Sequence, residues 1–283
     1  MTLAAPVVED RPVPTDWDDA YANAPHIPDA DAILAGWDVA APAFRDALGP
    51  RARLGAPYPG PLGDARETCD LFLPDGAPRG LAVFIHGGYW MAFGPRTWSH
   101  LAAGPLARGW AVAMPSYTLA PQARIADITR QMAACLHALA AEVAGPIRLC
   151  GHSAGGHLAT RMLCGAGPAA AVSRVERCVS ISGVHDLRPL RRTRLNDTLR
   201  LDAQEAAAES PALRSPVDGA CVTAWVGADE RPEFVRQSAL LANVWAGLGA
   251  ATRLVVDPGR HHFDVIAGLA EADSPLTAEL CGD

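Results

Sequence analysis

The chain lacks long uncharged hydrophobic runs, a recognisable secretion signal and an excess of positive charge. No stretch of about 18 apolar residues is free of charges and prolines, so no transmembrane helix is predicted. Residues 1–10 contain neither a basic start nor a long apolar core, which a signal peptide needs. The formal net charge of −7 and the isoelectric point near 5.7 argue against a nucleic acid or an anionic membrane as partner.

A disulfide framework is not predicted either. The seven cysteines are odd in number and widely spaced, and no two of them form a C-x-x-C pair. Most lie in apolar runs, where cysteine behaves as a small hydrophobic residue. This use of cysteine fits a reducing compartment, so we expect a cytoplasmic protein. The oligomeric state is left open, with a homodimer among the options.

The most informative motif that is present is Gly151-His152-Ser153-Ala154-Gly155. It follows a short apolar run and precedes a helix-like segment, which predicts a tight strand-to-helix turn with the serine at its tip. Glycine is needed there because a Cβ would crowd the strand or the helix, and the serine backbone is expected to be strained. The serine hydroxyl then lies at a helix N-terminus, whose dipole favours developing negative charge. Ser153 is therefore the candidate nucleophile.

A second glycine motif, His86-Gly87-Gly88, follows the apolar run Leu81–Ile85. In folds that contain such a serine turn, an HGG segment after an upstream strand supplies backbone N–H groups that bind an oxyanion. We assign the oxyanion hole to the N–H groups of Gly87, Gly88 and Ala154.

The general base is expected near the C-terminus, because the chain order of such a constellation is serine, acid, histidine. The loop after the last strand-like run contains two adjacent histidines, His261 and His262, followed by Phe263. We favour His262, since the apolar side chain directly after it should anchor the loop. His261 remains the alternative.

The acid should follow the preceding strand, where Gly227-Ala228-Asp229-Glu230 offers two carboxylates. We favour Asp229, which would hold the histidine tautomer and stabilise the imidazolium formed during attack. Two alternatives remain open. One is the adjacent Glu230, and the other is Asp186, which follows the strand expected at 177–182.

The hydrophobic pattern from residue 67 onward alternates strand-like and helix-like segments. Strand runs are continuously apolar, which is typical of strands buried on both faces. The alternation predicts an α/β fold with a mostly parallel central sheet and helices on both faces. Strands are expected near 69–73, 81–86, 110–115, 147–151, 177–182, 221–227 and 252–257, and helices at 96–108, 125–143, 154–164, 233–248 and 263–271.

Two segments depart from this alternation. Residues 1–66 are expected to form an N-terminal extension packed on the main domain, 67–283, with a helix near 29–48. Residues at about 183–218 form an insertion between strands, which would lie over the carboxyl ends of the sheet, where ligands bind in such folds. We expect a small lid there. Its arginine group, 188–194, could meet a carboxylate-bearing substrate or could be a solvated loop face.

Taken together, these motifs resemble the α/β-hydrolase fold superfamily, and more narrowly its kynurenine formamidase (arylformamidase)-like and HGG-motif esterase branch. The resemblance rests on HGGYW at 86–90, GHSAGGHL at 151–158, SGVHDL at 182–187 and YANAPHIP at 21–28. It implies that Ser153 is the nucleophile, Asp229 the acid and His262 the base, although the doubled histidine departs from the commoner single one. The H-x-G-T-H-x-D motif of the metal-dependent formamidases is missing, so neither a metal nor another cofactor is expected.

The resemblance further implies a serine hydrolase that cleaves an aryl formamide, N-formyl-L-kynurenine, to kynurenine and formate through an acyl-enzyme. Tyr89 and Trp90 would then line an aromatic leaving-group pocket, although they could equally pack the loop against the body. The alternative is a carboxylesterase for small acyl esters. A non-catalytic binding protein is disfavoured, because such a protein has no need of the whole constellation.

Overall fold

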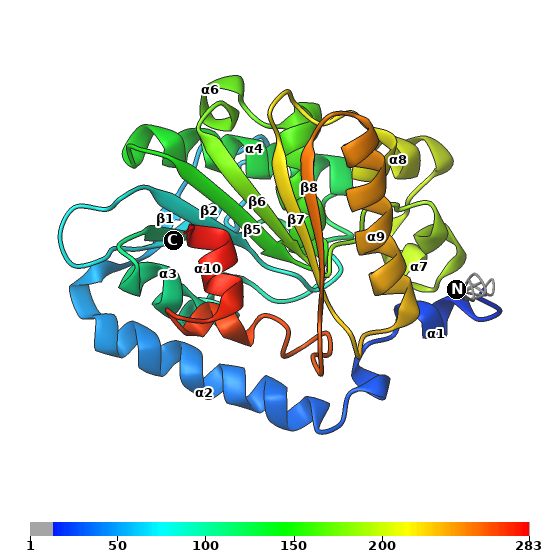
Figure 1. Cartoon of the computed structure of the whole chain (residues 1–283), viewed down its shortest axis with the longest axis horizontal. Helices are drawn as coiled ribbons and strands as arrows, with labels where there is room; N and C mark the ends of the chain where they lie inside the picture. The colour runs from blue at the N-terminus through cyan, green and yellow to red at the C-terminus, as the bar shows by residue number, and fades with distance from the viewer. Residues whose placement is uncertain (1–13, 283) are drawn as a thin grey trace, which may run out of the picture.

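An eight-stranded sheet forms the centre of the structure, a computed structural model that describes residues 14–282 (Figure 1). Residues 1–13 lie outside the described residues, so the prediction that residues 1–10 are not a signal peptide concerns a segment that the structure does not describe. The strands are β1 (Ala52–Pro57), β2 (Thr68–Phe72), β3 (Leu81–Ile85), β4 (Ala111–Pro115), β5 (Ile147–His152), β6 (Val175–Ile181), β7 (Cys221–Gly227) and β8 (Ala251–Asp257).

The strand order is β1-β2-β4-β3-β5-β6-β7-β8. Only β2 runs antiparallel to its neighbours, and β4, β3, β5, β6, β7 and β8 are mutually parallel. The expectation of a mostly parallel sheet is therefore confirmed. The carboxyl ends of the parallel strands point to one edge, where the serine turn lies.

Helices cover both faces of this sheet. The α-helices are α1 (Trp17–Tyr21), α2 (Ala30–Leu48), α3 (Ala103–Ala107), α4 (Ile125–Glu142), α5 (Ala154–Arg161), α6 (Ala169–Val172), α7 (Leu195–Leu199), α8 (Ala203–Ala208), α9 (Pro232–Gly247) and α10 (Pro275–Cys281). Short 3₁₀ turns are η1 (Ala24–His26), η2 (Gly49–Arg51), η3 (Pro95–Ala102), η5 (Pro189–Arg192), η6 (Pro211–Leu213) and η7 (Ala267–Ala270), and η4 (Met162–Ala166) is a π-helical turn.

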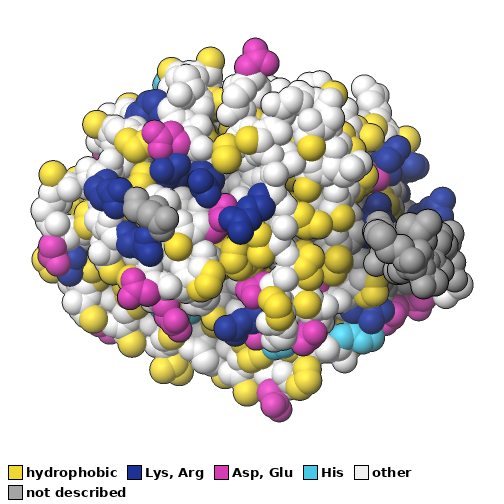
Figure 2. Space-filling model, in the orientation of Figure 1, with side chains coloured by type: hydrophobic (Ala, Val, Ile, Leu, Met, Phe, Trp, Pro, Cys, Tyr) yellow, Lys and Arg dark blue, Asp and Glu magenta, His cyan; other side chains and the backbone are white. Residues whose placement is uncertain are grey.

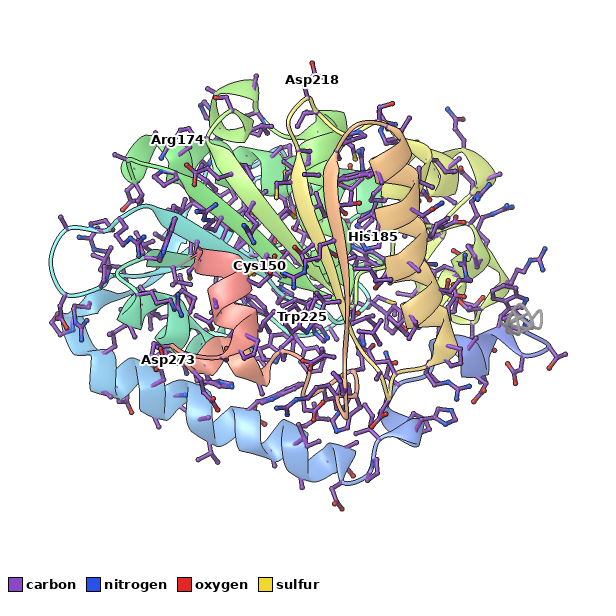
Figure 3. All side chains as sticks on the ribbon, in the orientation of Figure 1. Cys150, Arg174, His185, Asp218, Trp225 and Asp273 are labelled. Carbon is purple, nitrogen blue, oxygen red and sulfur yellow. The ribbon has the colours of Figure 1, made fainter. Side chains whose placement is uncertain are left out.

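Successive residues of the central strands face two separate hydrophobic layers. On β3, Leu81, Val83 and Ile85 pack with α4, α5 and α9, whereas Ala82 and Phe84 pack with α2, α3 and α10. All five side chains are buried, because the sheet is covered on both sides and the strand can therefore be continuously apolar. Cys150 and Trp225, labelled in Figure 3, belong to the second layer.

The helix expected near 29–48 is α2, which runs along the lower side of the molecule in Figure 1. Its buried residues are Trp37, Ala41 and Leu48, which recur at helical spacing. Trp37 lies 5.2 Å from Trp98 of η3, measured between ring centroids. The long N-terminal helix is therefore held on the domain through aromatic contacts.

Two elements differ from the sequence expectations. The segment 52–57, expected within an extension, is the edge strand β1, whose mostly exposed side chains give no hydrophobic signal. The helix expected at 263–271 is wrong: only the 3₁₀ turn Ala267–Ala270 forms there. The side-chain hydroxyls of Ser274 and Thr277 donate to the carbonyl oxygen of Gly268, and a further helix, α10, follows.

The surface in Figure 2 has basic, acidic and hydrophobic side chains distributed over the visible face. The formal excess of acidic residues is small for a chain of this length, 31 Asp and Glu against 24 Lys and Arg. Within residues 14–282, no helix is both long enough and apolar enough to span a membrane.

Candidate active site

The serine turn lies at the carboxyl end of β5, directly before α5. Ser153 has φ 56° and ψ −118°, a backbone conformation that L-residues rarely adopt, and its N–H donates to the carbonyl oxygen of Ile181 at 2.8 Å. A Cβ on Gly155 would lie 1.9 Å from the carbonyl oxygen of Ile85, and one on Gly151 would lie 2.2 Å from that of Gly155. Both glycines are therefore required by the close approach of α5 to β3 and β5.

The HGG segment lies against this turn, as the position of the motif predicts. A Cβ on Gly87 would come within 3.1 Å of the Cβ of Ser153. Gly88 has φ 103°, and its carbonyl oxygen accepts hydrogen bonds from the N–H groups of Met91 and Ala92 at 2.9 and 3.0 Å. These bonds fix the loop in a tight turn beside the serine.

Three backbone N–H groups around the serine are available to a ligand. Those of Gly87, Gly88 and Ala154 have no acceptor within the described part of the chain. Ala154 is the first residue of α5, where an N–H group has no partner within the helix. The expected oxyanion donors therefore lie close to Ser153 with their hydrogen-bonding capacity unused.

The two aromatic residues after the glycines have different surroundings. Tyr89 lines the pocket that contains Ser153, and its hydroxyl donates to the carbonyl oxygen of Tyr21 at 2.5 Å. Trp90 is fully buried and packs edge-on against the ring of His157 at 5.1 Å. Of the two roles expected for Trp90, the structure shows packing, because its side chain points into the core and does not line the pocket.

A histidine that lines the pocket is paired with a buried carboxylate. The Nδ1 atom of His262 lies 2.6 Å from Oε2 of Glu230, and both side chains are buried. The other oxygen, Oε1, accepts from the N–H of Gly227 at 2.9 Å and from the hydroxyl of Ser182. Three hydrogen bonds thus hold the carboxylate, and the imidazole is bound through Nδ1, which leaves Nε2 free.

This geometry corrects the expected acid. Asp229 is exposed, and its backbone N–H donates to the carbonyl oxygen of Arg260 at 2.9 Å. The turn after β7 therefore directs Asp229 towards solvent and Glu230 towards His262. The second alternative, Asp186, makes a two-oxygen contact with Arg188 at 2.9 Å.

The adjacent histidine has a local structural contact. Nδ1 of His261 accepts from the backbone N–H groups of Phe263 and Asp264 at 3.2 and 3.3 Å. His261 therefore stabilises the turn of its own loop, whereas His262 lines the pocket with Ser153. No hydrogen bond joins the hydroxyl of Ser153 to His262 in this structure; such contacts often tighten only when substrate binds.

The pocket has a volume of about 410 Å³ and aromatic walls. Ser153 is 3% exposed and lies at its floor. The lining comes from four parts of the chain: Asp18, Tyr21 to Pro25 and Trp37 from the N-terminal segment, Gly88, Tyr89, Phe93 and Trp98 from the HGG loop and η3, His152 from the serine turn, and Arg194, Leu195, His262 and Phe263 from the C-terminal half. The contribution of the N-terminal segment was not expected from the sequence, which gave it no motif beyond YANAPHIP.

His152 is a polar group of the pocket that sequence reasoning did not assign to the site. Its side chain is buried, neither ring nitrogen has a hydrogen-bond partner among the described residues, and its ring lies 4.5 Å from that of His262. Burial, and secondarily the neighbouring His262, lower the pKa of His152 well below its ordinary value. His152 is therefore neutral at physiological pH.

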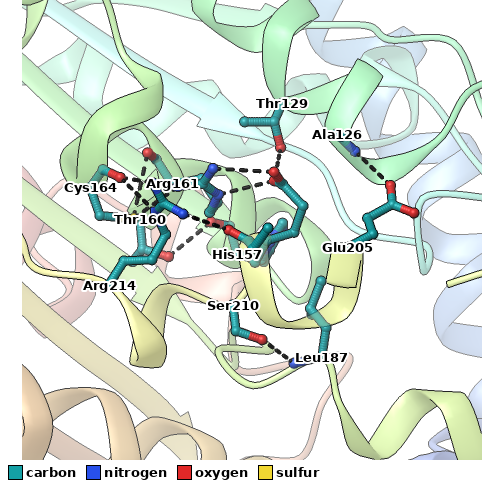
Figure 4. Close-up of polar contacts among 12 residues, drawn as sticks. Ala126, Thr129, His157, Thr160, Arg161, Cys164, Leu187, Glu205, Ser210 and Arg214 are labelled. Atoms are coloured by element: carbon teal, nitrogen blue, oxygen red, sulfur yellow. Dashed lines mark hydrogen bonds and ion pairs between the residues drawn. The ribbon is translucent and has the colours of Figure 1, made fainter. Parts of the chain in front are cut away.

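The insertion at 183–218 is anchored to the domain by buried polar contacts (Figure 4). Glu209, directly after α8, accepts from Arg161 of α5 at 3.0 and 3.2 Å and from the Thr129 hydroxyl of α4 at 2.7 Å. Its carbonyl oxygen also lies 2.7 Å from Nε2 of His157. The insertion is thus tied to the helix that begins at the candidate nucleophile.

We expect Glu209→Ala to lower the free energy of unfolding by about 3–5 kcal/mol, because it leaves the buried guanidinium of Arg161 without its partner. Urea unfolding measures this. Glu142→Ala is the matched control, since its ion pair with Arg53 is exposed and should be worth about 1 kcal/mol or less. If both variants lost the same free energy of unfolding, the buried pair would stabilise the fold no more than the exposed one, which would contradict the prediction.

The same pair should make stability depend on acid pH. Burial alone would raise the pKa of Glu209, but the hydrogen bond and charge of Arg161 outweigh it, so the pKa lies below its ordinary 4.5. The stabilisation is then present above pH 4.5 and is lost as the pH falls through the folded-state pKa. Acidification below pH 4.5 should therefore cost the wild type more stability than Glu209→Ala.

No group of three or more His, Cys, Asp or Glu side chains within residues 14–282 is arranged to hold a metal ion. The pocket does contain a serine with a strained backbone, a histidine paired with a carboxylate, and N–H groups without an acceptor among the described residues. Nucleophilic catalysis uses groups of these kinds.

Comparisons with known proteins agree with this architecture. The chain matches the family model described as alpha/beta hydrolase fold over residues 82–263, more than half of its length. It is 27% identical over 233 residues to kynurenine formamidase of Danio rerio (78% of this chain, 79% of that protein) and 29% identical over 240 residues to kynurenine formamidase of Drosophila melanogaster (77% and 78%).

Solved structures extend the comparison. A proposed thioesterase from Silicibacter sp. TM1040 superposes with a TM-score of 0.88 at 48% identity, covering 94% of this chain and 98% of that one. An esterase of Pyrobaculum calidifontis superposes with a TM-score of 0.67 at 18% identity, covering 90% and 94%, which shows a shared fold. The expected resemblance is confirmed, and the chain belongs to the alpha/beta hydrolase fold family.

Proposed function

We propose that this protein hydrolyses an aryl formamide, with N-formyl-L-kynurenine as substrate and kynurenine and formate as products. The observation that supports this best is a single pocket in which a serine at a strained turn and a carboxylate-bound histidine are surrounded by aromatic side chains. Its volume is of the size that small-molecule sites commonly have. The kynurenine formamidases among its relatives point to the same substrate class.

In the proposed reaction, Nε2 of His262 takes the proton of the Ser153 hydroxyl as the oxygen attacks the formyl carbon. A bond forms between the serine oxygen and that carbon, and the N–H groups of Gly87, Gly88 and Ala154 bind the oxyanion. The bond from carbon to nitrogen then breaks, and the imidazolium of His262 gives its proton to the leaving aryl amine.

Water completes the cycle. His262 again accepts a proton, this time from the water that attacks the formyl ester of Ser153. The ester bond from carbon to the serine oxygen then breaks, the imidazolium returns its proton to that oxygen, and formate is released. Throughout, Glu230 accepts a hydrogen bond from Nδ1–H of His262, which fixes the tautomer and stabilises the imidazolium. Glu230 takes the role that the sequence assigned to Asp229, because its carboxylate contacts the ring whereas Asp229 is exposed.

The surroundings of the serine suit a very small acyl group and a flat leaving group. Gly87 and the neutral ring of His152 lie close to Ser153, which restricts the acyl side. Trp37, Phe93 and Trp98 line the remaining wall, where an aromatic amine could stack. This combination suits formyl transfer from an aryl amine.

Cleavage of small esters or thioesters is the second candidate, favoured by the 48% identity to the proposed thioesterase. The same catalytic groups would serve both reactions. The two candidates differ in the acyl group and the leaving group, which are properties of the pocket walls and not of the fold.

The deciding experiment compares kcat/KM for N-formyl-L-kynurenine, p-nitrophenyl acetate and a short-chain acyl thioester, with Ser153→Ala as the blank. We expect a preference for the formamide of about 100-fold or more, since an enzyme whose site matches the leaving group discriminates by several kcal/mol. Efficient ester or thioester turnover without formamide cleavage would replace the proposal with the second candidate.

A further inference from the structure

The mouth of the pocket contains one acidic and one basic side chain in contact with each other. Nε of Arg194 donates to Oδ2 of Asp18 at 2.9 Å, and the backbone N–H of Arg194 donates to Oδ1 at 2.6 Å. Among the described residues, no other Asp, Glu, Lys or Arg lines the pocket. The side chain of Arg194 is 85% exposed whereas Ser153 is 3% exposed, which places the pair at the entrance and the serine at the floor.

The pair joins two segments that are far apart in the chain. Asp18 belongs to α1, and Arg194 directly precedes α7 within the insertion. A second contact supports the junction, because the guanidinium of Arg192 lies over the ring of Trp17 at 5.4 Å. The N-terminal segment and the insertion therefore meet where a substrate would enter.

Arg194 differs from Arg188 because a single hydrogen bond orients its guanidinium and leaves other donors of the group free. Arg188 contacts both oxygens of Asp186, whereas Arg194 contacts Asp18 through Nε alone. Its two terminal nitrogens have no partner within residues 14–282. A guanidinium held in this way presents two parallel N–H donors, the geometry that binds a carboxylate.

We propose that Asp18 and Arg194 bind the α-amino acid head of the substrate, with Arg194 on the carboxylate and Asp18 on the ammonium group. This inference rests on the proposed function, because kynurenine is a leaving group with a free amino acid at the end remote from the formamide. A zwitterion matches an entrance with one charge of each sign. The aromatic walls bind the ring but cannot distinguish a charged head from a neutral one, so this pair determines specificity.

Three aryl formamides test the inference, all with a ketone ortho to the formamide. N-formyl-L-kynurenine has the complete head, 4-(2-formamidophenyl)-4-oxobutanoate lacks the ammonium group, and 2′-formamidoacetophenone lacks the whole head. The wild type should favour the first over the last by about 10- to 100-fold in kcat/KM, mainly through KM, since a charged hydrogen bond typically contributes this much.

Arg194→Gln should remove most of the preference for the two substrates that have a carboxylate, and Arg194→Lys should retain part of it. Asp18→Asn should lower the preference for N-formyl-L-kynurenine over the analogue without the ammonium group. The control is Arg191→Gln, an exposed arginine of the same insertion that does not line the pocket, which should keep wild-type values for all three substrates.

The outcomes separate the inference from the proposed function. Equal kcat/KM for all three formamides in the wild type would leave the formamidase activity standing and overturn the role of the pair. If Arg194→Gln kept the wild-type preference for substrates with a carboxylate, the role of the pair would also be overturned, and the formamidase activity would stand. Failure to cleave any of the three would overturn the proposed function and the inference together. Turnover of 2′-formamidoacetophenone by each variant shows that the variant is folded.

Discussion

Ser153→Ala is expected to lower kcat for N-formyl-L-kynurenine by about 10⁵- to 10⁶-fold, the loss typical of removing a catalytic serine. The hydroxyl is the only group of the turn that can form the acyl bond. The methyl group of alanine replaces it without changing the backbone, which is held by the hydrogen bond from the Ser153 N–H to Ile181. The folded structure should therefore survive.

Steady-state kinetics, thermal unfolding and covalent labelling by a fluorophosphonate probe measure this prediction. The variant should unfold like the wild type and should not be labelled. Ser173→Ala is the control, because that serine is exposed and its hydroxyl donates, within the described part of the chain, to the carbonyl oxygen of Ala170 alone. Activity above about 1% of wild type in pure Ser153→Ala protein would remove Ser153 from the mechanism.

Glu230→Gln is expected to lower kcat by about 10³- to 10⁴-fold, through the tautomer of His262. The N–H of Gly227 and the hydroxyl of Ser182 both donate to Oε1 of Glu230. A glutamine would keep its oxygen at that position and turn its NH₂ group towards Nδ1 of His262. The ring would then have to accept at Nδ1 and bind its proton at Nε2, where it could no longer take the proton of Ser153.

Asp229→Asn is the matched control, since it makes the same chemical change one residue earlier, on an exposed side chain. It should change kcat by less than about threefold, as surface substitutions usually have small effects. The two variants decide which carboxylate acts on His262, because they make the same chemical change at adjacent positions and only one of the two side chains contacts the ring in the described structure. A mild loss in Glu230→Gln together with a severe loss in Asp229→Asn would show that the pairing in the structure is not the catalytic one.

Much of the architecture could be predicted from the sequence because each feature has a local cause. Continuously apolar runs predicted the buried strands, and the glycines at 151 and 155 predicted the serine turn. The structure gives the reason for these glycines: the atoms of β3 and of the turn occupy the space where a Cβ would be. Likewise, Gly87 and Gly88 lie beside the serine because β3 and β5 are neighbours in the sheet.

Features whose cause is not local were missed or assigned to the wrong residue. The edge strand β1 pairs through its backbone and leaves most side chains exposed, so its sequence has no hydrophobic pattern. For Trp90 the sequence left lining of the pocket and packing against the body equally open, and the ring lies in the core, after two residues with positive φ angles, Tyr89 and Trp90 itself. Neither the backbone pairing of β1 nor the direction of the Trp90 side chain can be inferred from residue types alone.

The sequence by itself determined the α/β class, the serine turn and the glycine loop beside it, since these depend on hydrophobic period and on the absence of Cβ atoms. Only the tertiary structure decided which of two adjacent carboxylates contacts His262, because a tight turn after β7 sends Asp229 to solvent and Glu230 inward. It also decided the pocket entrance, where Asp18 and Arg194, 176 positions apart, are brought into contact only by folding.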